Sequence, residues 1–219
     1  MSDLLKVRIG GSDYLCKWDP NFVVIGGRKY KTVKIGNQIW LAENLDWKFT
    51  GLNYKDGTSS NTLDNTSTPQ AAYYNYDEAT FGITGKNFGL MYNWYAVDYL
   101  NNHLSDLGVP AGWHVPTAYE FDDMVTACGS NPAMKLKATT EWASGAGTDD
   151  YGFAALPTGF WGTTAYTFGN IYQYGDFWTA TEYSATDAWD KSIGSGSSVD
   201  SHTYEKFDCF SLRLVKAIA

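Results

Sequence analysis

Short apolar runs alternate with glycine and asparagine turns in the first fifth of the chain. The runs VRIGGSDYLCKW and FVVIGGRKYKTVKIGNQIWLAENL are typical of successive β-strands. Gly-Gly and Gly-Asn pairs are frequent in two-residue hairpin turns, because these residues accept a positive φ. We therefore predict antiparallel hairpins with turns at Gly10–Gly11, Gly26–Gly27 and Gly36–Asn37.

One segment further along the chain has a clear helix start. Thr117 lies three residues before Glu120, which is the spacing of a capping box, and the apolar positions that follow recur at helical spacing. This pattern predicts a helix that ends near Cys128. A second, shorter helix is predicted in PAMKLKA, because Pro132 is well placed for a first helical turn.

The remaining pattern predicts a domain with few helices. Residues 50–70 are rich in turn formers and contain almost nothing to bury, so we expect a long surface loop. The run CFSLRLVK near the end has the period of a half-buried strand. Many short strands, few helices and long loops are typical of an α+β domain. We divide the chain into an N-terminal strand extension, residues 1–22, and a main domain, residues 23–219.

Composition limits the classes of function. Of 219 residues, 44% are hydrophobic, which is enough for a core, whereas 18% are charged and 16% are aromatic. The surface must therefore carry many Tyr, Ser, Thr, Asn and Gly side chains, which suits polar recognition. The net charge of −8 argues against nucleic acid and anionic membranes as partners, because both attract clustered Lys and Arg.

The N-terminus has no charged start followed by an apolar core, and nothing in the chain approaches a membrane span. We therefore expect a soluble protein without a signal peptide. The three cysteines are odd in number and widely separated, which argues against a disulfide framework. We expect buried, reduced thiols at Cys16, Cys128 and Cys209.

No sequence motif indicates an active site. The three histidines, His103, His114 and His202, have no metal-ligating partner at i+2 or i+4, and no phosphate loop, dinucleotide fingerprint or GxSxG is present. His114 is expected to be a hydrogen-bonded structural residue. Helix-dipole stabilisation explains Asp122–Asp123. The loop pair Asp149–Asp150 is a candidate for calcium, but no other cofactor is indicated.

Six ordered motifs carry a resemblance to a known family. They are VKIGNQIWLAENLDW, GLMYNWYAV, PAGWHVPTAYEF, KLKATTEW followed by GTDDYGFAALPTGFW, FWTATEYSATDAW, and FSLRLVK. Over residues 23–216 the chain resembles the Fibrobacter succinogenes major paralogous domain family, a bacterial and viral group with a C-type-lectin-like fold.

The resemblance implies two helices that flank twisted antiparallel sheets, with the N- and C-terminal strands close together. It also implies that the aromatic residues of the motifs are mostly scaffold, namely Trp40, Trp94, Trp113, Trp178 and Trp189. The formylglycine-generating enzymes share this general fold but depend on paired thiols near the C-terminus. Cys209 is alone in its neighbourhood, so we expect no enzyme activity of that kind.

The same fold family includes the variable proteins of diversity-generating retroelements, which resemble phage tropism determinants. In those systems a C-terminal segment is rewritten at adenines, chiefly in AAC or AAT codons, which cannot become Lys, Glu, Gln, Met or Trp codons. Residues 192–204 contain none of these five types, and no Asn follows Asn170. Within the variable-looking segment 177–215, we predict that twelve residues bind ligand, all of which are reachable from an Asn codon: Tyr183, Asp187, Asp190, Ser192, Gly194, Gly196, Asp200, Ser201, His202, Tyr204, Phe207 and Asp208.

Between these positions lie four residues of types outside that repertoire, predicted to be fixed: Trp189, Lys191, Glu205 and Lys206. Cys209 replaces the glycine that the family usually has, which marks either a diversified position or drift. Tyr, Ser, Gly and Asp are also the residues that antibodies use for recognition. We therefore interpret SIGSGSSVDSHTY as a loop held between strands that displays a binding surface, with a plain solvated loop as the alternative.

The resulting hypothesis is a protein that binds a protein or cell-surface receptor, on a virus or at a bacterial surface. The alternative is a carbohydrate-binding or adhesion module of fixed specificity, in which Asp149 and Asp150 matter more. An enzyme is the least favoured class. The sequence does not specify an oligomeric state.

Overall fold

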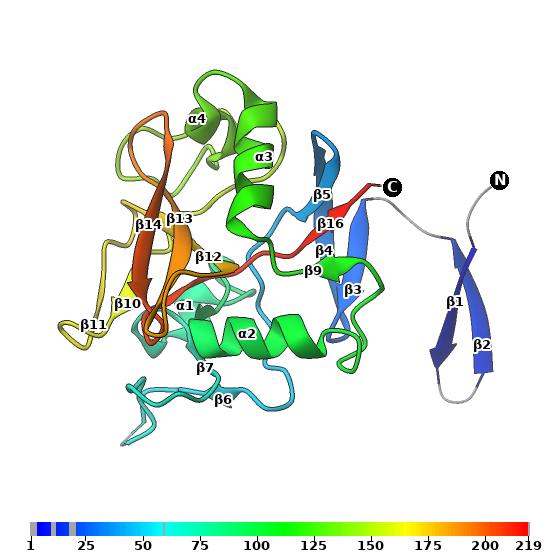
Figure 1. Cartoon of the computed structure of the whole chain (residues 1–219), viewed down its shortest axis with the longest axis horizontal. Helices are drawn as coiled ribbons and strands as arrows, with labels where there is room; N and C mark the ends of the chain where they lie inside the picture. The colour runs from blue at the N-terminus through cyan, green and yellow to red at the C-terminus, as the bar shows by residue number, and fades with distance from the viewer. Residues whose placement is uncertain (1–3, 10–11, 18–20, 59, 219) are drawn as a thin grey trace.

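A computed structural model of the protein describes residues 4–9, 12–17, 21–58 and 60–218, with the backbone alone before residue 21. The first predicted hairpin is confirmed: β1 (Leu4–Ile9) and β2 (Ser12–Lys17) pair antiparallel in a sheet of their own (Figure 1). Its predicted turn at Gly10–Gly11 and the side chain of Cys16 lie outside the described residues.

A five-stranded sheet joins the two ends of the main domain. Its order is β3-β4-β5-β16-β9, so that β16, the last strand, pairs with β5 as the family resemblance implied. The β3–β4 turn has Gly26 and Gly27 at φ +57° and +82°, which confirms that hairpin, and the hairpin at Gly36–Asn37 is also confirmed. The strands are β3 (Phe22–Ile25), β4 (Arg28–Ile35), β5 (Gln38–Leu41), β9 (Trp113–His114) and β16 (Val215–Ala217).

A nine-stranded sheet forms the rest of the scaffold. Its main path is β14-β13-β12-β15-β8-β7-β6, and β10 pairs with both β15 and β11. All pairs are antiparallel except β12 with β15 and β6 with β7. The strands are β6 (Asn53–Tyr54), β7 (Gln70–Ala72), β8 (Met91–Asn93), β10 (Phe160–Gly162), β11 (Thr167–Gly169), β12 (Gly175–Glu182), β13 (Asp187–Ile193), β14 (Val199–Glu205) and β15 (Cys209–Ser211).

Both predicted helices are present. The capping box between Thr117 and Glu120 starts the longer one, and Pro132 occupies the first turn of the shorter one. The helix after β8 was not predicted, although Asn93 caps it by accepting the N–H of Ala96. The helices are α1 (Glu78–Phe81), α2 (Trp94–His103), α3 (Ala118–Cys128) and α4 (Pro132–Leu136), with a 3₁₀ turn, η1, at Tyr74–Tyr76.

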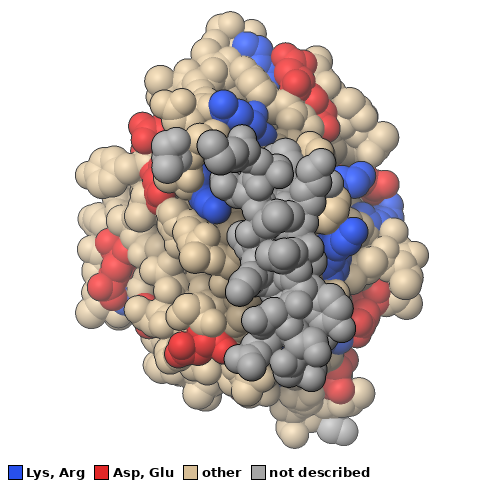
Figure 2. Space-filling model, turned by 90° about the vertical axis from the view of Figure 1, so that its right-hand side faces the viewer, with Lys and Arg blue, Asp and Glu red and all other residues tan. Residues whose placement is uncertain are grey.

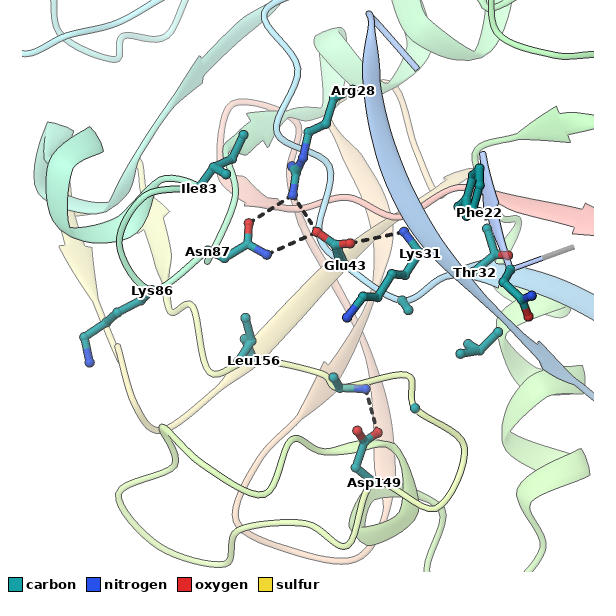
Figure 3. Close-up of a pocket in the computed structure, with 15 residues that line it drawn as sticks. Phe22, Arg28, Lys31, Thr32, Glu43, Ile83, Lys86, Asn87, Asp149 and Leu156 are labelled. Carbon is teal, nitrogen blue, oxygen red and sulfur yellow. Dashed lines mark hydrogen bonds and ion pairs between the residues drawn. The ribbon is translucent and has the colours of Figure 1, made fainter. Parts of the chain in front are cut away.

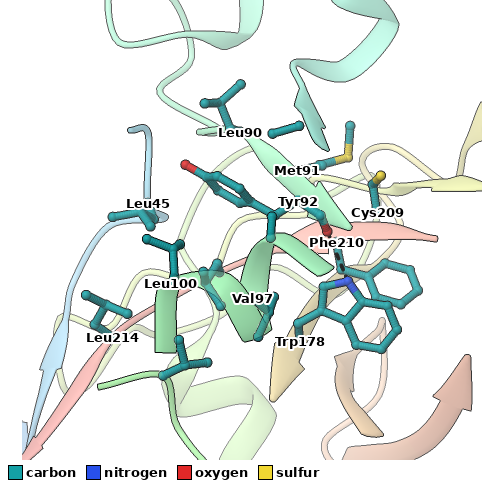
Figure 4. Close-up of a cluster of buried hydrophobic side chains, with 14 of the residues drawn as sticks. Leu45, Leu90, Met91, Tyr92, Val97, Leu100, Trp178, Cys209, Phe210 and Leu214 are labelled. Atoms are coloured by element: carbon teal, nitrogen blue, oxygen red, sulfur yellow. Dashed lines mark hydrogen bonds between the residues drawn. The ribbon is translucent and has the colours of Figure 1, made fainter. Parts of the chain in front are cut away.

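Strand β12 lies between two hydrophobic cores, because successive side chains of a strand point to opposite faces. Trp178 packs in the core that α2 covers, and its Nε1 donates to the carbonyl of Tyr92 at 3.0 Å (Figure 4). Phe177 packs in the core that α3 covers, against Phe121. The two helices therefore flank the sheet (Figure 1), and the predicted α+β class is confirmed.

The scaffold role predicted for the motif tryptophans agrees with their positions. Four of them, Trp40, Trp94, Trp113 and Trp178, are buried in the cores. Trp189 is half-buried, and its ring lies edge-on to that of Tyr183.

The C-terminal run is more deeply buried than its alternating pattern predicted. Residues 209–211 form β15 in the large sheet and residues 215–217 form β16 in the other, so the expected single strand is wrong. The chain is buried on both faces from residue 209 to residue 215, since the cores enclose it from two sides. Arg213 sits inside this segment and donates only to protein oxygens among the described residues.

The expectation that residues 50–70 have almost nothing to bury is also wrong. Leu63 packs in the main core, and Gln70 is buried because its amide donates to Asp64 and Thr66. Lys55 is buried as well and pairs with Asp64 at 3.0 Å. A polar side chain can therefore be an interior residue here, because hydrogen bonds within the segment satisfy it.

Candidate ligand-binding face

The stretch 192–204 is a β-hairpin and not the loop that its composition predicted. Strand β13 pairs antiparallel with β14, with Asp190 opposite His202 and Ser192 opposite Asp200, and residues 194–198 form the connection. Strand β14 is an edge of the nine-stranded sheet. Seven of the twelve residues proposed to bind ligand therefore lie on a strand ladder, which fixes their directions more strongly than a loop would.

The twelve predicted positions differ in their access to solvent. Six are exposed and form what we call the exposed rim: Tyr183, Gly196, Asp200, Ser201, His202 and Tyr204. Three are half-buried at its margin: Asp187, Gly194 and Phe207. The structure buries the other three, which therefore do not present their side chains to a partner in this conformation: Asp190, Ser192 and Asp208.

Three residues of the exposed rim project from one face of β14. Asp200, His202 and Tyr204 alternate along the strand, and the rings of His202 and Tyr204 lie edge-on with centroids 6.0 Å apart. Tyr204 also packs against Phe210 of β15, at 5.0 Å between centroids, so its body is anchored in the core while it stays 38% exposed. Such a side chain offers contact area at a low cost in conformational entropy.

The positions predicted to be fixed make scaffold contacts. Lys191 is buried and its ammonium bonds the Asp122 carboxylate of α3 at 2.5 Å and the Ser201 hydroxyl at 2.8 Å. Lys206 is also buried, pairs with Glu182 and lies over the ring of Trp94 at 4.7 Å. These two residues tie the hairpin to α3 and to the start of α2.

Two buried carboxyl groups lie beneath the hairpin. Ser192 donates its hydroxyl to Asp176 Oδ1 at 2.5 Å, and the backbone N–H of His202 donates to Asp190 Oδ1 at 3.1 Å. Asp190 Oδ2 is buried without a hydrogen-bond partner among the described residues. Burial raises the pKa of Asp190 to about 8, repulsion from Asp176 adds to this shift, and burial raises the pKa of Asp176 to about 6.

Sequence reasoning missed Asp176. Only the register of the sheet, which pairs Asp176 with Ser192, brings it under the hairpin. A single Asp in a run such as GDFWT carries no signal of burial, because aspartate is usually exposed.

The other residues considered for chemistry have structural partners. His114 bonds Glu120 Oε1 through Nε2 at 2.6 Å and the carbonyl of Gly112 through Nδ1, which confirms its structural role. Burial raises the pKa of the free thiols of Cys128 and Cys209, so both match the predicted buried cysteines. Asp149 Oδ1 accepts the N–H of Ala154 at 2.8 Å.

The calcium question rests on Asp149 and Asp150. Asp150 is exposed, and the part of the chain that the structure describes has no group of three or more His, Cys, Asp or Glu side chains placed to hold a metal ion.

Within the described residues, no helix is both long and apolar enough to cross a membrane. Figure 2 shows Lys and Arg next to Asp and Glu across the described part of one face, so that face carries both signs of charge.

Comparison with known proteins identifies one family. The model of the Fibrobacter succinogenes major domain matches residues 33–216, which agrees with the motifs and covers most of the chain. The match begins ten residues after the boundary predicted from the motifs. No curated protein and no solved structure matches the chain.

Proposed function

The chain belongs to the Fibrobacter succinogenes major domain family, and we propose that it is a ligand-binding protein. In this proposal a C-type-lectin-like scaffold presents the exposed rim to a protein or cell-surface receptor. The rim is diversified as in the variable proteins of diversity-generating retroelements, and the protein is displayed on a virion or at a cell surface.

One observation carries the proposal. Six of the twelve positions predicted to bind ligand are exposed on β14 and on the connections at residues 183–186 and 194–198, whereas the interleaved Lys191 and Lys206 are buried in scaffold contacts. A surface that varies without unfolding the protein requires this separation. Exposed side chains tolerate substitution better than buried charged ones do, although the rim residues Ser201 and Tyr204 contact the buried Lys191 and Phe210, respectively.

The chemistry of the exposed rim supports recognition of another macromolecule. Tyr183 and Tyr204 provide large amphipathic rings, and the ring of Tyr183 is supported by Trp189 at 5.4 Å. Asp200, Ser201 and His202 add donors and acceptors between them. Since β14 is an edge strand, its outer backbone groups can also pair with a partner.

The alternative is a carbohydrate-binding or adhesion module of fixed specificity. It would use Asp149 and Asp150 in preference to the hairpin, and it predicts that substitutions on the exposed rim leave binding unchanged. Substitutions on the exposed rim should therefore abolish binding under the proposed function, whereas substitutions of Asp149 and Asp150 should abolish it under the alternative.

A display library tests the proposal. The six codons of the exposed rim are replaced by NNC, the protein is displayed on yeast, and folded clones are selected for binding to a single probe protein, lysozyme. We expect most clones to stay folded, because exposed substitutions change the free energy of unfolding by about 0.5 kcal/mol or less each. We also expect binders with a Kd of about 1 µM or tighter.

The matched control randomises the interleaved positions, which are Trp189, Lys191, Glu205 and Lys206. This library should lose folded display, because Lys191 and Lys206 are buried and their replacement removes packed side chains together with their hydrogen bonds to Ser201 and to the carbonyl of Ala185. Equal loss of folded display in both libraries, or a rim library without binders, would contradict the proposal.

A further inference from the structure

A cavity of about 870 Å³ lies away from the exposed rim. It is formed by β3, β4 and the segments around residues 43, 83–87 and 149–156, and it shares no residue with β12, β13 or β14 (Figure 3). Its volume is within the range of small-molecule sites.

The inner polar residues of the cavity neutralise one another. Arg28 Nη2 lies 2.5 Å from Glu43 Oε2 and 3.2 Å from Asn87 Oδ1. The amide of Asn87 also donates to Glu43 Oε2, and the backbone N–H of Lys31 donates to Glu43 Oε1. The charges of Arg28 and Glu43 therefore pair with each other, while Arg28 Nη1 is buried without a hydrogen-bond partner among the described residues.

Two lining charges of opposite sign have no ion-pair partner among the described residues. The Lys31 ammonium reaches toward the middle of the lining residues in Figure 3, and the Asp149 carboxylate faces the cavity from another segment. Asp149 uses one oxygen for the N–H of Ala154. Lys86 is different, because it points away and bonds Glu141 at 2.5 Å.

Apolar side chains lie between these charges. Phe22, Val33 and Leu156 are half-buried in the lining, and Ile83 is 52% exposed at its margin. Among the described residues, the cavity therefore offers one cation, one anion and an apolar surface.

We propose that this cavity binds a small zwitterion with an apolar side chain, either a free amino acid or a dipeptide. The Lys31 ammonium donates to the carboxylate of this ligand, the Asp149 carboxylate accepts from its ammonium group, and the side chain of the ligand packs against Phe22 and Leu156. A ligand with a single charge would pair with only one of Lys31 and Asp149, and would therefore form one charge-assisted interaction in place of two. This site is independent of the exposed rim and of its proposed function.

Isothermal titration calorimetry on the full chain at pH 7 tests this inference. The zwitterionic probes are L-phenylalanine and L-leucyl-L-phenylalanine, and the single-charge probes are 3-phenylpropionate and 2-phenylethylamine. We expect at least one zwitterion to bind roughly tenfold more tightly than either single-charge probe. A comparison of L-phenylalanine with L-leucyl-L-phenylalanine then shows whether the cavity prefers a free amino acid or a dipeptide.

Charge-removing variants locate the site. Lys31→Gln and Asp149→Asn should each weaken zwitterion binding by roughly tenfold. Asn at position 149 keeps an acceptor for the N–H of Ala154 and tolerates the local φ of +50°, so the loop is preserved. The matched controls, Lys34→Gln and Asp150→Asn, change exposed neighbours outside the cavity and should leave the affinity unaltered.

Three results would overturn the inference. They are no heat of binding with either zwitterion, equal binding of a single-charge probe, or unchanged affinity in both Lys31→Gln and Asp149→Asn. None of these results bears on receptor binding, because the library positions and the cavity share no residue.

Discussion

Replacement of Arg213 by methionine is expected to lower the free energy of unfolding by about 3 to 5 kcal/mol. Methionine fills a similar volume, so the effect isolates the guanidinium group. That group is buried between the two sheets, and its loss leaves buried acceptors without a donor, each at a cost of about 1 to 3 kcal/mol. The acceptors are Asn44 Oδ1 and the carbonyl oxygens of Leu41, Phe153 and Ala154.

Urea unfolding followed by tryptophan fluorescence measures this effect. Lys34→Met, an equivalent change at an exposed site, should alter the free energy of unfolding by about 0.5 kcal/mol or less. If Arg213→Met lowered the free energy of unfolding by less than about 1 kcal/mol, the hydrogen bonds of Arg213 would not join the C-terminal segment to the neighbouring loops.

A rise in pH from 5 to 8 is expected to lower the free energy of unfolding by about 5 kcal/mol. The pKa of Asp190 is raised to about 8 and that of Asp176 to about 6, chiefly by burial. In the unfolded chain both carboxyl groups lose their protons near pH 4. The folded state therefore binds more protons over this range, and stability falls as the pH rises through the two folded pKa values.

Asp190→Asn should remove most of this pH dependence, because asparagine stays neutral and keeps an acceptor for the N–H of His202. Asp200→Asn, an exposed change on the same hairpin, should retain it. Urea unfolding at pH 5, 6, 7 and 8 compares the three proteins. If the free energy of unfolding changed equally with pH in the wild type and in Asp190→Asn, Asp190 would not hold its proton in the folded state.

Local signals in the sequence were sufficient for several elements. Gly26–Gly27 predicted a hairpin because a turn with positive φ requires such residues, and Thr117 with Glu120 predicted α3 because capping acts within four residues. The cap of α2 at Asn93 was an equally local signal, but it was missed because Asn93 lies within an aromatic run. These features depend on neighbours in the chain and not on the packing of the domain.

Tertiary packing decided the features that the sequence did not predict. The alternating run at residues 209–215 is buried on both faces because α2 and α3 cover different cores, and alternation alone cannot reveal a second covered face. Residues 192–204 have a loop-like composition, yet the ladder to β13 makes most of them strands. β-propensity is a weak guide at an edge strand, where cross-strand neighbours set the structure.

The candidate sites show the same division. The residue types in the segment predicted which positions could vary, but they did not predict which of these positions are exposed. Only the folded sheet shows that His202 is exposed while Asp190, which pairs with it, is buried. The cavity was not predicted, because Lys31 and Asp149 are more than a hundred residues apart in the chain and line the same cavity only in the folded protein.

The DNA that flanks the gene provides the most direct test of a diversified binding surface. Sequencing should reveal a near-repeat of the segment that encodes residues 177–215, with AAC or AAT at exposed-rim codons such as those of Tyr183, His202 and Tyr204. The same repeat should keep the codons of Lys191 and Lys206 unchanged. Flanking DNA without such a repeat, or a repeat whose differences fall on the buried lysines, would contradict the account.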